Sequence, residues 1–185
     1  MRIVGGCLKG RELRSFSNMG NASLRPTSDR VKESVFNVLT HRFQLDFHGI
    51  NVLDLFAGTG SLGLEALSRG AGNVTFVERD SYACSIILDN ARILGVKSKI
   101  SIKKKNCLSI GENGSNPFDL VFMDPPYGQK LGEKVLENML NGNWFRLKTL
   151  IVWEENTKIM EPKNLNRLDI RKYGETNILI GEMIV

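Results

Sequence analysis

The stretch LDLFAGTGSLGLEALSRGA, residues 53–71, decides the expected fold. It reads as the end of a buried strand over residues 50–56, a glycine-rich turn, and a helix over residues 62–69. Between strand and helix, three glycines form the pattern G-x-G-x-x-G: Gly58, Gly60 and Gly63. Glycines in such a turn let the backbone approach a ligand closely, as in folds that bind a dinucleotide. The stretch therefore predicts a cofactor site at the carboxyl edge of a parallel sheet.

Apolar runs and helical patterns alternate along the rest of the chain. Further strands are expected over residues 73–78, 99–105, 118–123, 149–154, 167–172 and 177–185, and further helices from about Ser28 or Asp29, over 81–95 and over 131–140. Because strands that alternate with helices form right-handed crossovers, most of the sheet should be parallel, with helices on both faces. No helix separates the last two strands, which should pair antiparallel around Gly174. The predicted fold is α/β and Rossmann-like: a seven-stranded, mostly parallel sheet with an antiparallel C-terminal hairpin, the layout of class I methyltransferases.

The composition fits one globular domain of ordinary kind. The chain has 185 residues, of which 42% are hydrophobic and 24% charged. Its three cysteines are far apart and form no Cys-x-x-Cys pair, which argues against a disulfide framework and a metal site: Cys7, Cys84 and Cys107. No apolar run approaches the ~18 residues of a membrane span, and the N-terminus lacks the apolar core of a signal peptide. We therefore expect a cytoplasmic monomer without metal or membrane contact.

The net charge of +5 is concentrated at one end of the chain. Residues 1–32 carry two acidic side chains and seven basic ones: Arg2, Lys9, Arg11, Arg14, Arg25, Arg30 and Lys32. Apolar residues around the glycines of this segment indicate a short hairpin followed by a helix. A basic excess confined to one segment is typical of contact with a polyanion, most simply nucleic acid. We therefore divide the chain into a basic, nucleic-acid-binding extension (1–27) and a catalytic domain (28–185).

The charge around the glycine turn favours one class of cofactor. A nicotinamide dinucleotide would place an anionic pyrophosphate against the turn, where the carboxylate of Asp54 would repel it. S-adenosylmethionine carries an ammonium and a sulfonium instead, and Asp54 can receive the ammonium directly or through water. Glu78, at the end of the next strand, can accept both ribose hydroxyls, and Asn106 can pair with the adenine amine. The site residues therefore favour S-adenosyl-L-methionine.

A second motif, Asp124-Pro125-Pro126-Tyr127, follows the expected strand 118–123. The two prolines fix the backbone, so that the carboxylate of Asp124 and the carbonyl of Pro125 form a pair of acceptors. Such a pair suits an exocyclic amine, which has two hydrogens to donate. Tyr127 supplies an aromatic plane for a base that has left its stack. The motif therefore predicts methylation of an amine on a nucleobase, with the amine nitrogen as nucleophile.

Several stretches of the chain resemble the bacterial RsmD family, which methylates the N2 amine of one guanine in 16S ribosomal RNA. The resemblance lies in RIVGG (residues 2–6), LRPTSDRVKESVFN (24–37), the 53–71 stretch, DPPY (124–127) and KYGETNILI (172–180). It implies that the basic side chains named above bind RNA and that residues 124–127 hold the guanine amine. It also implies a set of cofactor-binding residues: Asp54, Phe56, Gly58, Thr59, Gly60, Glu78, Arg79, Asn106 and Cys107. The implied partner is 16S ribosomal RNA, within a partly or fully assembled small subunit.

Two other functions stay open on the sequence. DPPY also occurs in DNA adenine-N6 methyltransferases, although no inserted target-recognition region is visible in this chain. A non-catalytic RNA-binding or assembly module that holds the cofactor without turnover is the second alternative. Neither the identity of the guanine nor the need for ribosomal proteins follows from the residues.

Overall fold

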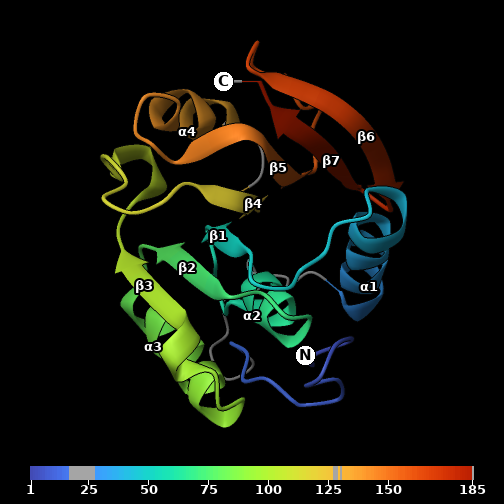
Figure 1. Cartoon of the computed structure of the whole chain (residues 1–185), viewed down its shortest axis with the longest axis vertical. Coiled ribbons are helices and arrows are strands. Elements are labelled where there is room, and N and C mark those ends of the chain that lie inside the picture. Colours follow the sequence, from blue (N-terminus) through green and yellow to red (C-terminus); the bar gives the residue numbers. More distant parts are fainter. Residues whose placement is uncertain (17–27, 127–128, 130, 185) are drawn as a thin grey trace.

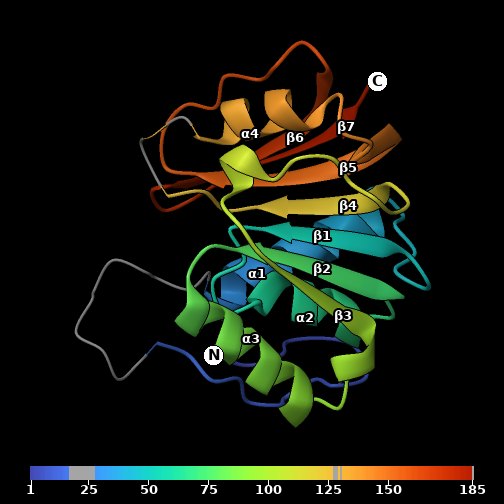
Figure 2. The same ribbon diagram turned by 90° about the vertical axis from the view of Figure 1, so that its left-hand side faces the viewer.

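The computed structural model describes residues 1–16, 28–126, 129 and 131–184. Within them, seven strands form one sheet in the order β3-β2-β1-β4-β5-β7-β6 (Figure 1). The strands are β1 (Asn51–Leu55), β2 (Asn73–Glu78), β3 (Ile100–Lys104), β4 (Phe118–Met123), β5 (Phe145–Glu155), β6 (Leu165–Tyr173) and β7 (Thr176–Met183). Figure 2 shows them side by side, from β3 at the bottom to β6 and β7 at the top. The predicted α/β fold with a seven-stranded sheet is confirmed.

The direction of the strands also agrees with the prediction. β1 to β5 run parallel to one another, and β7 runs antiparallel to both β5 and β6. The order of the strands reverses between β1 and β4, so the connections from these two strands leave in opposite directions. In such sheets, ligands bind beside the carboxyl ends of the strands at this switch point.

Among the described residues, four α-helices cover the two faces of the sheet. They are α1 (Asp29–Asn37), which continues into a π-helical turn η1 (Val38–Arg42), α2 (Ser61–Ser68), α3 (Ser81–Ile93) and α4 (Leu131–Met139). Apolar side chains of α1, α2 and α3 belong to one buried cluster, and those of α4 belong to a second cluster. No helix among the described residues has the length and apolar character that a bilayer crossing requires.

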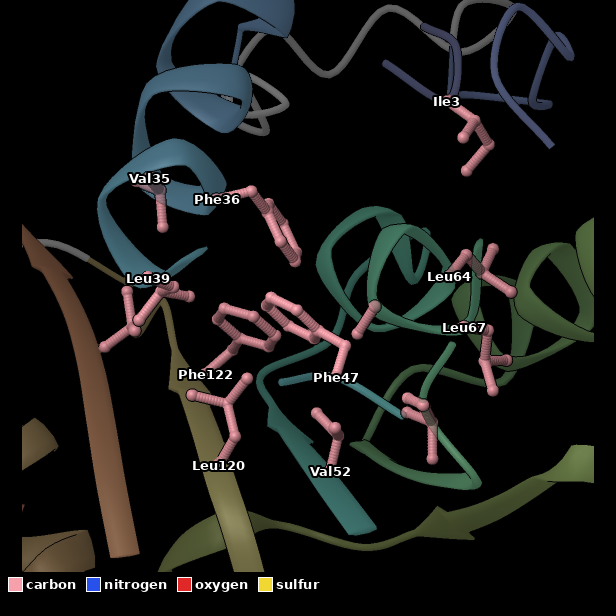
Figure 3. Close-up of a cluster of buried hydrophobic side chains, with 14 of the residues drawn as sticks. Ile3, Val35, Phe36, Leu39, Phe47, Val52, Leu64, Leu67, Leu120 and Phe122 are labelled. Atoms are coloured by element: carbon pink, nitrogen blue, oxygen red, sulfur yellow. The ribbon is translucent and has the colours of Figure 1, made fainter. Parts of the chain in front are cut away.

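Helix α1 begins where the sequence predicts, and its apolar face reaches the centre of the first cluster. The hydroxyl of Ser28 accepts a hydrogen bond from the backbone N–H of Val31, which caps the helix. Phe36 is fully buried and its ring lies 5.4 Å from the rings of both Phe47 and Phe122. Figure 3 shows these three rings packed together beneath α1. The aromatic contact therefore joins α1 to β4.

The N-terminal segment forms a hairpin-like loop against α2, as both ribbon views show. Its two arms meet at one antiparallel bridge, Arg2 with Glu12, so the expected hairpin is present but is shorter than two regular strands. The backbone of Cys7 donates to the Ser68 carbonyl at 2.7 Å. A Cβ on Gly6, which has φ of 73°, would lie 2.0 Å from that same carbonyl oxygen. Glycine is therefore required where the loop touches the helix.

A buried charged network holds this loop to the two helices. Lys32 is fully buried, and its Nζ donates to the Arg2 carbonyl at 2.6 Å and to the Ser61 hydroxyl at 3.1 Å. The same Nζ lies 4.0 Å from a carboxylate oxygen of Glu65, which is also fully buried. Burial lowers the pKa of Lys32, and the charge of Glu65 opposes that shift. The prediction that Lys32 binds RNA is wrong, because this side chain has no access to solvent.

The carboxylate of Glu65 completes the network. One of its oxygens accepts a hydrogen bond from the backbone N–H of Val4 at 2.8 Å, and the other accepts one from the Nε–H of Arg69 at 2.9 Å. The carboxylate therefore contacts the N-terminal loop, the last turn of α2 and, through Lys32, helix α1. Buried charges without such partners would be strongly unfavourable.

Replacing Lys32 by Met keeps the aliphatic stem and removes the ammonium. We expect Lys32→Met to lower the free energy of unfolding by about 3 kcal/mol, because breaking a buried pair leaves the remaining charge poorly compensated. Urea unfolding followed by circular dichroism measures the loss. The exposed Lys9 offers a matched control, and Lys9→Met should stay within about 0.5 kcal/mol of the wild type. Equal stabilities of the two variants would contradict the role given to the network.

Candidate active site

The glycine turn connects β1 to α2 with several residues in the left-handed region. Phe56, Gly58 and Gly60 have φ values of 57°, 54° and 77°, and the N–H of Gly60 donates to the Ala57 carbonyl at 2.7 Å. Gly63 has a different purpose, since a Cβ there would lie 2.4 Å from the ring of Phe76. Its missing side chain lets α2 pack directly on β2. The turn thus lies at the carboxyl end of β1, as the sequence predicts.

Asp54 lies in β1 just before this turn and is only 3% exposed. One carboxylate oxygen accepts the backbone N–H of Gly63 at 2.9 Å, which fixes the first turn of α2 to the strand. Burial raises the pKa of Asp54 to about 8, with a smaller contribution from the charge of Glu78, while the Gly63 hydrogen bond acts in the opposite direction. The carboxyl group therefore has a structural partner as well as a place beside the glycine turn.

Glu78 ends β2 and is held by two backbone hydrogen bonds. Its Oε2 accepts the N–H of Gly58 and its Oε1 accepts the N–H of Asp80, each at 2.9 Å. Each oxygen has a further lone pair with which to accept from a ligand. The carboxylate is thus oriented by the glycine turn on one side and by the start of α3 on the other. This arrangement suits the predicted role of Glu78 at a pair of ribose hydroxyls.

Other predicted cofactor residues have roles of their own in the structure. Thr59 is buried, and its hydroxyl donates to the sulfur of Met1 at 3.5 Å, so its side chain contacts the N-terminal loop. The amide oxygen of Asn106 accepts the N–H of Leu108 at 3.0 Å and caps a short 3₁₀ helix, η3 (Cys107–Ser109). Arg79 is exposed beside Glu78. Contact of these residues with a cofactor stays a prediction.

Cys107 is buried next to the turn. Burial raises the pKa of its thiol to about 12, so the side chain is a neutral, apolar group near pH 7. It belongs to the same buried cluster as Leu55 at the end of β1. Cys107 therefore suits the wall of an apolar pocket rather than nucleophilic chemistry.

Asp124 directly follows β4, at the same edge of the sheet as Asp54 and Glu78. Pro125 is buried and Pro126 is exposed, whereas Tyr127 lies outside the described residues. Burial raises the pKa of Asp124 well above its usual range, and the charges of Glu154 and Asp54 raise it further. The carboxyl ends of β1, β4 and β5 thus present an acidic centre. A cation or an amine beside these carboxyl groups would favour their ionised forms, so the centre suits such groups better than phosphate.

The basic residues predicted to bind RNA divide into several groups. Lys9, Arg11 and Arg30 are exposed, and Arg25 lies outside the described residues. Arg2 and Arg14 are exposed but form ion pairs, with Asp29 at 3.2 Å and with Asp89 at 2.8 Å. Two arginines that no sequence pattern singles out, Arg42 and Arg171, line the same groove as Arg30. They come from segments far apart in the chain, and no local pattern connects them.

The raised pKa of Asp54 predicts a pH dependence of stability. A carboxyl group whose pKa is raised in the folded state favours folding below its unfolded pKa of about 4, and this contribution is lost as the pH rises towards 8. We expect the free energy of unfolding to fall more steeply between pH 5 and pH 7 in the wild type than in Asp54→Asn, by up to about 1.4 kcal/mol per pH unit. Urea unfolding at these pH values measures the difference.

Asparagine at position 54 keeps an oxygen that can accept the Gly63 N–H, so the variant removes the ionisation with little change in the hydrogen bond. Glu175→Gln, at an exposed turn, is the matched control and should leave the slope of the wild type unchanged. Parallel stability curves for the wild type and Asp54→Asn would rule out the ionisation of Asp54 as the source.

Comparisons with known proteins identify relatives of the whole chain. The family model described as conserved hypothetical protein 95 matches residues 1–182. Ribosomal RNA small subunit methyltransferase D of Haemophilus influenzae is 35% identical over 179 residues, which cover 94% of this chain and 89% of the relative. The putative rRNA methyltransferase YlbH of Bacillus subtilis is 32% identical, with 97% of each chain covered.

Solved structures show the same architecture. A putative methyltransferase from Escherichia coli superposes with a TM-score of 0.84 and 30% identity, and the match covers 99% of this chain and 97% of that chain. A putative methylase from Haemophilus influenzae superposes with a TM-score of 0.81 and 30% identity, with 100% and 98% covered. The fold is therefore that of the class I methyltransferases, and the chain belongs to the RsmD family, whose model is described as conserved hypothetical protein 95.

Proposed function

We propose that this protein transfers a methyl group from S-adenosylmethionine to the exocyclic N2 amine of a guanine in small-subunit ribosomal RNA. One observation carries the proposal: the Asp124-Pro125 acceptor pair follows β4 at the same sheet edge as the glycine turn and Glu78. The name of the Haemophilus influenzae relative supports ribosomal RNA of the small subunit as the substrate class. A cytoplasmic location follows from that substrate.

The residues at the edge fit a cationic cofactor with a nucleoside. When bound, S-adenosylmethionine supplies a methyl group made electrophilic by its sulfonium. Glu78 would hold the ribose hydroxyls, while the backbone at Gly58 and Gly60 allows close approach to the ligand. Phe56 and Cys107 would contact the adenine. A positive charge beside Asp54 would favour its ionised form and oppose the effect of burial on its pKa.

The acceptor pair prepares the amine for reaction. The Asp124 carboxylate and the Pro125 carbonyl can accept the two N–H bonds of a guanine N2 amine. These hydrogen bonds favour a pyramidal nitrogen and direct its lone pair to the side opposite the two acceptors. The positive charge of a bound cofactor would favour the ionised form of Asp124, and the raised pKa then suits this carboxylate for receiving the proton that the methylated amine loses. Tyr127 would stack on the guanine after it has left its helix.

The exposed basic residues would contact the RNA backbone. Lys9 and Arg11 belong to the N-terminal loop, and Arg30 lies in the first turn of α1. A single domain has little further surface with which to read a sequence, so the shape of a partly or fully assembled small subunit would contribute to specificity. The division into a 1–27 extension and a 28–185 domain remains a prediction, although residues 1–16 pack tightly on α2 and α3.

A methyl-transfer assay tests the proposal directly. Labelled S-adenosylmethionine is supplied with undermodified small subunits, free ribosomal RNA or duplex DNA, and the methylated nucleoside is identified after digestion. We expect label in N2-methylguanosine. Label confined to adenine of DNA would overturn the RNA assignment, and bound cofactor without any transfer would identify a binding module instead.

Asp124→Ala tests the role of the carboxylate. We expect turnover to fall by about 100-fold or more, because the variant loses an acceptor and a proton-receiving group, while cofactor affinity stays near that of the wild type. Single-turnover kinetics and calorimetric titration with the cofactor measure the two quantities. Asp46→Ala, at an exposed loop position, is the control and should retain full turnover. Normal turnover in Asp124→Ala would refute the role.

Charge removal in the N-terminal loop tests its contact with phosphate. Truncation would be uninformative because Ile3 and Leu13 belong to the core, so we choose Lys9→Gln with Arg11→Gln, both exposed. If both side chains contact phosphate, the slope of log affinity against log salt should fall by about 1.4 to 1.8. Fluorescence anisotropy with ribosomal RNA measures the slope. The exposed pair Lys134→Gln with Lys163→Gln should leave it unchanged, and an unchanged slope in the loop variant would exclude phosphate contact.

A further inference from the structure

A groove of about 430 Å³ lies between the α1–η1 helical segment and β6, which Figure 1 shows beside each other. Two arginines of the α1–η1 segment and one of β6 line it together with polar side chains of α1: Arg30, Arg42, Arg171, Glu33, Ser34 and Asn37. The catalytic site described above uses none of these residues.

Two of the arginines are held by a shared carboxylate. Nη1 of Arg42 and Nε of Arg171 both lie 2.9 Å from the same oxygen of Asp169. The Arg42 and Arg171 side chains are still 52% and 37% exposed, so each guanidinium group can also reach a ligand. The shared carboxylate sets the two guanidinium groups in one place before any ligand arrives. Such preorganisation reduces the entropy lost on binding.

A second contact fixes the walls of the groove. The hydroxyls of Ser34 on α1 and Tyr173 on β6 are hydrogen-bonded at 2.5 Å. The helix and the strand therefore cannot separate without breaking this bond. The distance between Arg30 on one wall and Arg171 on the other is thereby limited by the fold.

The charge and shape of these side chains favour a phosphate. The three guanidinium groups exceed the two nearby carboxylates, Glu33 and Asp169, by one positive charge. Guanidinium groups present planar pairs of donors that match the oxygens of a phosphate. The acidic centre at Asp54 and Asp124 has the opposite preference. Phosphate is therefore disfavoured beside Asp54 and Asp124 and favoured in the arginine groove.

The strand register connects the groove to the site of the amine. Arg171 pairs with Ile178 on β7, which pairs with Glu154 on β5. Glu154 follows Trp153, the partner of Met123 on β4, so Asp124 lies on the same row across the sheet. Three strand spacings separate Arg171 from Asp124, or roughly 14 Å. Both residues thus lie at one edge of the sheet, a few nucleotides apart on the scale of RNA.

We propose that this groove binds backbone phosphate of the RNA strand that carries the target guanine, with Arg30, Arg42 and Arg171 as its ligands. The proposal rests on the proposed function and adds a second point of contact to it. A phosphate held in the groove fixes the strand relative to Asp124. It thereby limits which nucleotide of the strand can enter the acceptor pair.

The double variant Arg42→Gln with Arg171→Gln tests the groove. We expect its dissociation constant for protein-free small-subunit ribosomal RNA to rise about tenfold and the slope of log affinity against log salt to fall by about 1.4 to 1.8. Fluorescence anisotropy at several salt concentrations measures both. With undermodified subunits as substrate, KM for the RNA should rise by a similar factor while kcat stays within about twofold. Calorimetry should show that the double variant binds the cofactor with the affinity of the wild type.

Arg167→Gln is the matched control. It lies on the same strand, is 56% exposed and pairs with Glu161 at 2.9 Å, yet it does not line the groove. Its RNA affinity and salt slope should equal those of the wild type. Circular dichroism checks the folding of the double variant. If it does not fold, Arg30→Gln, at an exposed position of α1, should still lower the slope of log affinity against log salt by about 0.7 to 0.9.

The outcomes separate this proposal from the function on which it rests. A wild-type enzyme that methylates the RNA, with a double variant of unchanged RNA affinity and slope, overturns the groove alone. A wild-type enzyme that transfers no methyl group to this RNA overturns the proposed function instead. Weaker binding to assembled subunits with unchanged binding to protein-free RNA would assign the groove to a ribosomal protein and overturn the proposal.

Discussion

The buried pair of Lys32 and Glu65 is the interaction on which the arrangement of this protein depends. Both side chains are fully buried, so each needs the partners that the N-terminal loop, α1 and α2 supply together. The pair also reaches Ser61, the first residue of α2, directly after the glycine turn. The position of the glycine turn is therefore coupled to segments that precede the sheet in the chain. A site built on one strand end is in this way supported from three elements.

The edge of the sheet combines two opposite electrostatic preferences. Asp54 and Asp124 form a centre that suits an amine and a cationic cofactor, and the arginines around Asp169 form a groove that suits phosphate. The substrate of a nucleobase methyltransferase carries both kinds of group, since a neutral base with its amine is attached to an anionic phosphate backbone. Under the proposed function, separating the two charges by several strands would let one sheet accommodate both the base and the backbone of the substrate.

Much of this architecture could be predicted because the signals are local. Ser28 and Asp29 mark the start of α1, the 53–71 stretch specifies strand, turn and helix, and the lack of a helix before β7 implies its reversed direction. Other features depend on contacts that no local pattern records. β5 begins four residues before the predicted position because a register shift, with Lys148 at φ of 66°, extends its pairing with β4. The burial of Lys32 and the convergence of the groove arginines are likewise products of tertiary packing.

The place of β7 has a consequence for synthesis of the protein. β7 follows all other strands in the chain, yet it lies between β5 and β6. Chains emerge from the ribosome beginning at the N-terminus, so β6 has no neighbour with which to pair until β7 has also emerged. The glycine turn and Asp124 can be in place earlier, because β1 to β5 pair without it. On a growing chain, the strands that carry the glycine turn and Asp124 can therefore pair before β6, which carries Arg171, has a neighbour in the sheet.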